Sequence, residues 1–152
     1  MIRNVSIISA IDVACRKEDA LALVWNIKNI ERTEVKADHV IEHKETERKC
    51  TYDVRDHFAG IPWHNTFAYE LNDKGFHSLE AHPPASGTRI SGGFIVDETG
   101  DKLCTIRHYE EYKLPKWAVP LKPFVVIYLK WSMRKELRDL RALILVYAAQ
   151  GE

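Results

Sequence analysis

The sequence predicts an α+β fold in which a curved antiparallel sheet of seven strands wraps around one long C-terminal helix. Between residues 36 and 114, segments of alternating polar and apolar residues follow one another across short polar turns, which join antiparallel neighbours. From Phe124 onward, apolar residues recur at spacings of three and four, the period of an amphipathic helix. One face of the sheet must be covered, and this helix is the only predicted element long enough to cover it.

The elements follow in a simple order along the chain. Alternation around Val5 and Ile7 predicts a first strand over residues 2–13. Apolar residues on one face and acids in the first turn predict a helix over 17–25, and a second short helix is expected over 27–33. The six remaining predicted strands are 36–45, 48–58, 62–71, 76–82, 88–97 and 102–114.

Glycines and prolines mark the breaks in this order. The pair Gly92-Gly93 predicts a bend or bulge, where the backbone can approach a neighbour closely. Pro115, Pro120 and Pro123 predict a linker before the last helix. That helix is predicted to expose a basic side and to bury an apolar stripe of Leu129, Met133, Leu137, Leu140, Ile144 and Tyr147.

Composition limits the class of protein. With 152 residues, the chain is expected to form a single domain spanning 1–152. Basic and acidic residues balance at 22 each, which removes the positive charge expected of a dedicated nucleic-acid binder. Three widely spaced cysteines favour free thiols in a reducing compartment. No apolar run has the length of a signal peptide or a membrane span, so we expect a cytoplasmic protein.

The strand 102–114 carries the most informative pattern. Alternation places an acid and a base, His108 and Glu110, on its better inward face, together with Tyr112. A buried polar group without a partner costs roughly 1–3 kcal/mol. These residues therefore either pair with one another in a dry network or line a pocket, and a curved sheet around one helix favours the pocket.

The predicted pocket is aromatic and apolar with a few polar anchors, as ligand sites usually are. In strand 76–82 the two phases are ambiguous, and we place Leu79 and Ala81 inward and His77 at the rim. The predicted lining consists of Tyr52, Val54, Asp56, Phe58, Trp63, Asn65, Phe67, Tyr69, Phe94, Ile106 and Tyr112 from the sheet, with Leu129, Met133 and Leu137 from the helix.

Three features together resemble a known superfamily. They are the Val24-Trp25 pair that ends the first helix, the GTRIS strand entry at 87–91, and the stretch MRKELRDLRALI at 133–144. The chain resembles the START/birch-pollen-allergen-like (SRPBCC) superfamily, in particular its polyketide cyclase/dehydrase and lipid-transport branch. The resemblance covers essentially the whole chain. It implies the helix-grip fold and a deep apolar cavity for lipids, sterols, quinones or aromatic polyketides, and in a minority of members a cyclase or dehydratase.

Two functions from different classes remain open. One is binding, and possibly transport, of a small hydrophobic or aromatic ligand such as a lipid, quinone or polyketide-like compound. The alternative is a polyketide cyclase or dehydratase that uses His108 and Glu110 as acid–base groups. If these two residues have no catalytic role, we expect them to form a half-exposed pair on the surface near the end of the strand.

Other partners have weaker support in the sequence. His39 and His43 would lie roughly 13 Å apart on a strand, too far for one ion, so neither a metal nor a cofactor is expected. The basic last helix, which begins with FVVIYLKW, is a candidate for transient contact with anionic lipid. A protein-interaction role has no visible apolar patch to support it. The oligomeric state is not predicted.

Overall fold

The computed structural model describes residues 3–26, 28–33, 37–44, 46–58, 61–80 and 89–151. Its elements in chain order are β1 (Asn4–Val13), α1 (Lys17–Val24), α2 (Asn29–Thr33), β2 (Ala37–Lys44), β3 (Lys49–Phe58), β4 (Ile61–Asn72), β5 (Gly75–Glu80), β6 (Arg89–Gly100), β7 (Leu103–Lys113), the 3₁₀ helix η1 (Lys116–Leu121) and α3 (Lys122–Gln150). The predicted α+β order of elements is confirmed.

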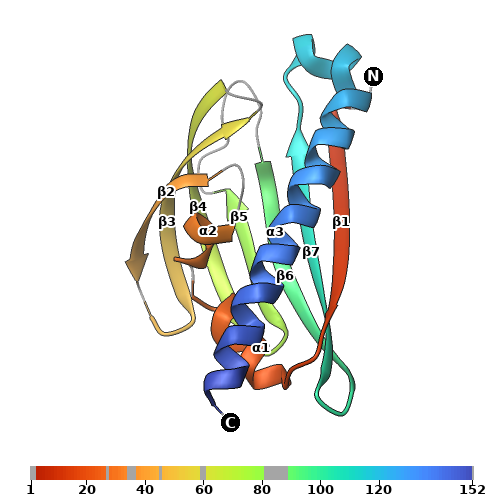
Figure 1. The fold of residues 1–152 in the computed structure, drawn as a ribbon. Helices are drawn as coiled ribbons and strands as arrows, with labels where there is room; N and C mark the ends of the chain where they lie inside the picture. The colour runs from red at the N-terminus through yellow and green to blue at the C-terminus, as the bar shows by residue number, and fades with distance from the viewer. Residues whose placement is uncertain are drawn as a thin grey trace.

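The seven strands form one antiparallel sheet in the order β1-β7-β6-β5-β4-β3-β2. The sheet curves, and α3 runs across its inner face close to β1 and β7, as Figure 1 shows. The short helix α1 packs against α3 and the sheet at the end of the molecule where the C-terminus lies. The indole of Trp25 fixes the end of α1, because its Nε1 donates a 3.0 Å hydrogen bond to the carbonyl oxygen of Gly75, the first residue of β5.

The long helix buries the stripe that its periodicity predicts, from Leu129 to Ile144. Tyr147 is the exception, since its side chain is exposed. It has the helical phase of the stripe but lies in the last turn of α3, which ends at Gln150.

The predicted proline linker is wrong. Residues 116–121 form η1, which continues directly into α3, and Pro123 falls in the first turn of that helix. A proline in the first turn costs little, because the N–H that it lacks would have no intrahelical partner there. Ala118 and Val119 of η1 are buried, so the segment is packed rather than extended.

Strand β5 has the opposite phase from the one predicted. Phe76 and Ser78 are buried, whereas Leu79 is exposed. The buried hydroxyl of Ser78 donates a hydrogen bond to the Gly92 carbonyl oxygen at 3.2 Å, which allows a serine to face inward. The apolar character of Leu79 was therefore a misleading signal.

The predicted bulge at Gly92-Gly93 is also misplaced, because the register shifts of β6 lie at its two ends. The close approach at Gly93 is present nevertheless. A Cβ atom on this residue would lie 2.2 Å from the Phe76 carbonyl oxygen and 2.6 Å from the Tyr109 phenol oxygen. That phenol lies over the glycine and forms a 2.6 Å hydrogen bond with Nδ1 of His77.

Replacing Gly93 by alanine is expected to destabilise the protein by about 2 kcal/mol, because backbone of β5 must move to accept the methyl group. Gly100→Ala is the matched control, since its Cβ would lie 3.5 Å from the nearest atom, an ordinary contact. Urea unfolding of both variants measures the difference. Equal stabilities would show that the strands have room to adjust.

Candidate functional site

Strand β7 presents the predicted inward row as a continuous buried face. Every second residue from Cys104 to Tyr112 is buried, and the residues between them are more exposed. His108 and Glu110 are therefore neighbours on the inner face of the sheet. Nε2 of His108 lies 3.3 Å from Oε1 of Glu110.

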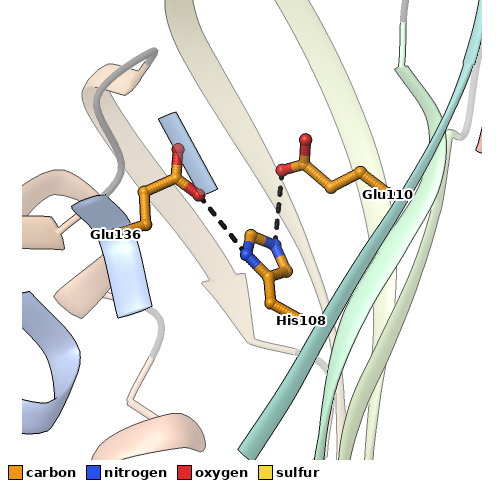
Figure 2. A group of neighbouring side chains, drawn as sticks. All are labelled: His108, Glu110 and Glu136. Carbon is orange, nitrogen blue, oxygen red and sulfur yellow. Dashed lines mark ion pairs between the residues drawn. The ribbon is translucent and has the colours of Figure 1, made fainter. Parts of the chain in front are cut away.

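A second carboxylate reaches the same histidine from the helix. Oε2 of Glu136, on α3, lies 3.3 Å from Nδ1 of His108. Figure 2 shows the imidazole held between the two carboxylates, one at each ring nitrogen. The phenol of Tyr112 donates a hydrogen bond to the other oxygen of Glu110. We call the series Glu136, His108, Glu110 and Tyr112 the buried acid–base chain.

This chain lies in the interior. His108 is 4% exposed, and Glu110 and Glu136 are 1% exposed each. A neutral imidazole donates from only one of its nitrogens, whereas a protonated one donates from both. The two carboxylates lie within ion-pair distance of opposite nitrogens of the imidazole ring.

The buried acid–base chain lies between two clusters of apolar core residues. On one side lie Val5, Ile7, Tyr112, Leu114, Val125, Leu129 and Met133. On the other side, α3 contributes Leu137, Leu140 and Ile144 to the larger cluster that includes α1 and the rest of the sheet. Glu136 lies at the boundary, between Met133 and Leu137 on the helix. Buried polar side chains therefore separate the two apolar clusters, although polar groups are costly to bury.

A row of rings crosses the inner face of the sheet and ends at this histidine. Neighbouring ring centroids are 5.5 Å apart for Tyr52 and Tyr69, 5.5 Å for Tyr69 and Phe76, and 5.3 Å for Phe76 and Phe94. Phe94 stacks on the His108 imidazole at 4.2 Å with planes 12° apart. The row runs from β3 to β7 and joins an aromatic surface to the acid–base chain.

One further ring extends this row, and one ring within it carries a hydroxyl group that donates a hydrogen bond. Phe67, fully buried, stacks on Tyr52 at 5.5 Å. Burial raises the pKa of Tyr69, so this phenol stays protonated and acts as a donor. Its hydroxyl donates to the Trp25 carbonyl oxygen at 3.3 Å.

Most of the predicted lining residues lie in the two clusters. Phe94 is half-buried, and the side chains of Asp56, Phe58, Trp63 and Asn65 lie outside the described part of the structure. Among the described lining residues, Tyr52, Val54, Phe67, Tyr69, Ile106 and Leu137 belong to the larger cluster, and Tyr112, Leu129 and Met133 to the smaller one.

Sequence reasoning missed Glu136 and Phe76. Glu136 comes three residues after Met133 and four before Leu140, so its place on the buried stripe was visible in the spacing. Glu136 was not predicted to be buried because it is charged and lies among basic residues in MRKELR at 133–138. Phe76 was missed because the prediction placed the face of β5 that carries Leu79 inward, whereas the opposite face is buried.

The same three residues offer a set of metal-binding atoms. One donor atom each from His108, Glu110 and Glu136 lies within 4.8 Å of the others, and an imidazole with two carboxylates suits a divalent first-row cation. However, a single ion coordinates one nitrogen of an imidazole, whereas here each carboxylate contacts a different one. In the observed arrangement the two carboxylates therefore flank the imidazole on opposite sides.

The buried thiols are shielded from reaction. Burial raises the pKa of Cys15 to about 12 and also raises the pKa of Cys104, whose thiol contacts the Cys15 carbonyl oxygen at 3.4 Å. Since the thiolate is the reactive form, we expect Cys15 in the folded protein at pH 8 to react with a disulfide reagent roughly a thousandfold more slowly than after unfolding in guanidinium. Mass spectrometry of the labelled peptides measures both rates. Equal rates at Cys15 would contradict this account.

The fold defines a protein of the helix-grip class, and solved structures of this class are similar to it. The Zhui aromatase/cyclase from Streptomyces sp. R1128 has a TM-score of 0.67 and 11% identity, with 97% of this chain and 94% of that chain covered. A START superfamily protein from Mycobacterium smegmatis has a TM-score of 0.73 and 10% identity, covering 91% and 96%.

Norcoclaurine synthase from Thalictrum flavum, in complex with dopamine and hydroxybenzaldehyde, has a TM-score of 0.66 and 14% identity, with 93% of this chain and 87% of that chain covered. The predicted resemblance to the START/birch-pollen-allergen-like superfamily is thus confirmed for the fold. No protein-family model and no curated protein matches the sequence. Within the described ranges, no helix is both long and apolar enough to cross a membrane.

Proposed function

We propose that this protein binds a small hydrophobic or aromatic molecule, such as a lipid, a quinone or a polyketide-like compound, between its sheet and α3. The row of rings that ends at His108 is the observation that carries the proposal. Flat rings offer an apolar surface to a flat or extended ligand, and the acid–base chain offers a polar group at one end of that surface. A ligand with one oxygen function is the chemical match.

The similar structures support the same class of ligand. One is an aromatase/cyclase, one is a START protein, and one holds two aromatic compounds. The division of the core supports it as well, because a polar interruption of this kind is costly unless it serves a purpose. The internal hollow that would receive the ligand remains a prediction, and so does a cytoplasmic location.

A second candidate, a cyclase or dehydratase, is favoured by the position of the histidine between two carboxylates. In its deprotonated form, His108 would take a proton from the carbon between two carbonyl groups of the substrate. The resulting enolate carbon would form a bond to a second carbonyl carbon of the same molecule. The histidinium would return its proton to the alkoxide oxygen, while Glu110 and Glu136 stabilise the charged ring in between.

Two measurements on one set of variants separate these functions. Binding of a fluorescent apolar probe reports the interior, and conversion of poly-β-ketone substrates reports chemistry. We compare His108→Gln and Glu110→Gln with His64→Gln, a matched change at an exposed position of β4. Probe binding by the wild type that a natural ligand displaces supports the binding function. Retained binding with lost turnover in the first two variants would favour the enzyme, and absence of any probe binding would overturn both.

A further inference from the structure

The outer side of the last helix is unexpectedly apolar. Phe124 is 71% exposed, Ile127 is 66% exposed and Trp131 is 50% exposed. Trp117 and Leu121, just before them, are exposed as well. Five large apolar side chains thus follow one another over η1 and the first three turns of α3. The sequence indicated no apolar surface patch, and the structure corrects that expectation.

These side chains lie opposite the buried stripe of the same helix. Ile127, Trp131, Arg134 and Arg138 are spaced by four, three and four residues, so they form one line along the helix. The line is apolar at its beginning and cationic at its end. We call Phe124, Ile127, Trp131, Arg134 and Arg138 the outer ridge.

Most of the charged side chains around the outer ridge are basic, although Asp139, beside Arg138, pairs with Lys135 at 2.9 Å. Between Glu111 and Glu136 the chain carries six basic residues and no acidic one, although its total charge is zero. Four of the six are Lys122, Lys130, Arg134 and Lys135 on α3 itself. The positive charge of this protein is therefore concentrated on the segment that also exposes its largest apolar side chains.

A groove of about 600 Å³ lies between α3 and β1, and the ridge residues Ile127, Trp131, Arg134 and Arg138 form part of its wall. Ile11 and Leu137 contribute apolar walls, while Lys130, Arg134 and Arg138 contribute cations. Figure 1 shows this half of α3 alongside β1, toward the end of the molecule that holds the N-terminus. Apolar walls with cations suit a molecule that has an anionic head and an apolar tail.

We propose that the outer ridge docks the protein on the surface of a bilayer that contains anionic phospholipid. Phe124, Ile127 and Trp131 enter the boundary between headgroups and acyl chains, and Arg134 and Arg138 contact the phosphate groups. Helices that lie in a membrane surface combine aromatic and aliphatic residues with Lys and Arg in this way. Tryptophan in particular favours the interface, where its ring is apolar and its N–H remains hydrated.

Charge decides between a bilayer and a second copy of the chain. A symmetric dimer through the ridge would place the same positive patch of both copies face to face. The two positive patches would repel each other in such a dimer, whereas an anionic bilayer would attract the positive patch of each copy. The inference does not depend on the ligand proposed for the interior, because the five ridge residues are exposed and none of them belongs to the predicted ligand lining.

Vesicle flotation of the full chain tests the proposal, with vesicles of phosphatidylcholine alone and of an equal mixture with phosphatidylglycerol. We expect binding to the mixture, weakened by salt, and far less to phosphatidylcholine. Each cation at a bilayer surface contributes about 1 kcal/mol, so Arg134→Gln with Arg138→Gln should weaken binding roughly thirtyfold. Phe124→Ser with Ile127→Ser should weaken it at least about tenfold.

Matched controls keep the test specific. Lys49→Gln with Arg55→Gln removes the same charge from β3, and Ile8→Ser removes an exposed apolar side chain from β1. Both should bind vesicles as the wild type does. The proposal fails if the wild type does not float with mixed vesicles, or if the controls lose as much binding as the ridge variants.

Two further results would assign the ridge to another occupant. A dimer in light scattering that Phe124→Ser with Ile127→Ser abolishes would make the ridge a contact between copies. Binding to soluble poly-glutamate that equals vesicle binding, and that the same two substitutions leave unchanged, would make it a site for an acidic protein. Either result would overturn the bilayer.

Discussion

Replacing His108 by leucine is expected to destabilise the protein by about 3–5 kcal/mol, the usual cost of removing one member of a buried ion pair. In the folded protein this imidazole lies 3.3 Å from a carboxylate at each ring nitrogen. Leucine has a similar volume, so the loss would come from electrostatics rather than from a cavity. Urea unfolding at neutral pH, followed by circular dichroism, measures the change in the free energy of unfolding.

Two controls identify the cause. His64→Leu makes the same change at an exposed position of β4 and should shift stability by no more than about 0.5 kcal/mol. Adding Glu110→Gln and Glu136→Gln to His108→Leu removes the two charges that the histidine compensates, and most of the lost stability should return. A loss below about 1 kcal/mol in His108→Leu would mean that the acid–base chain is not held by charge.

Phe67→Ala is expected to cost about 3–5 kcal/mol, the range for removing a large ring from a core. Phe67 is fully buried and stacks on Tyr52, so its removal leaves both a void and an unsupported neighbour in the row of rings. For a chain of this length, the melting temperature should fall by roughly 10 °C or more. Thermal unfolding measures the shift.

Phe67→Leu keeps most of the volume and should cost about 1 kcal/mol. Both variants also test the proposed ligand surface. Loss of the ring should weaken binding of a flat aromatic probe more than binding of an aliphatic one, because only the aromatic probe can stack. Equal losses for the two probes would mean that Phe67 supports the fold without contacting the ligand.

The inward face of β7 could be predicted because one strand of alternating residues fixes it without reference to any other element. The same is true of the stripe on α3, which depends on a period of three and four. Glu136 lay outside that reasoning for a physical reason. A carboxylate is normally a surface residue of a helix, and only the histidine across the gap makes its burial favourable.

The phase of β5 and the path of residues 116–121 could not be predicted, since both depend on partners distant in sequence. Ser78 faces inward because the Gly92 carbonyl oxygen accepts its hydrogen bond. Three prolines in a short stretch normally interrupt regular structure, yet here they suit a 3₁₀ helix and the first turn of α3. The sequence indicated the beginning of the last helix as a candidate for contact with anionic lipid, but it did not indicate the exposed apolar residues of the outer ridge, because periodicity was used to identify only the buried face of the helix.

Native mass spectrometry of the freshly purified protein tests the central claim most directly, namely that the interior between the sheet and α3 receives a small molecule. We expect a copurified apolar compound, or a one-to-one complex after incubation with lipids, quinones and aromatic polyketides, in either case released when the protein unfolds. If the protein is purified without a ligand and binds none of these compounds, the result would contradict the claim that its interior receives a small molecule.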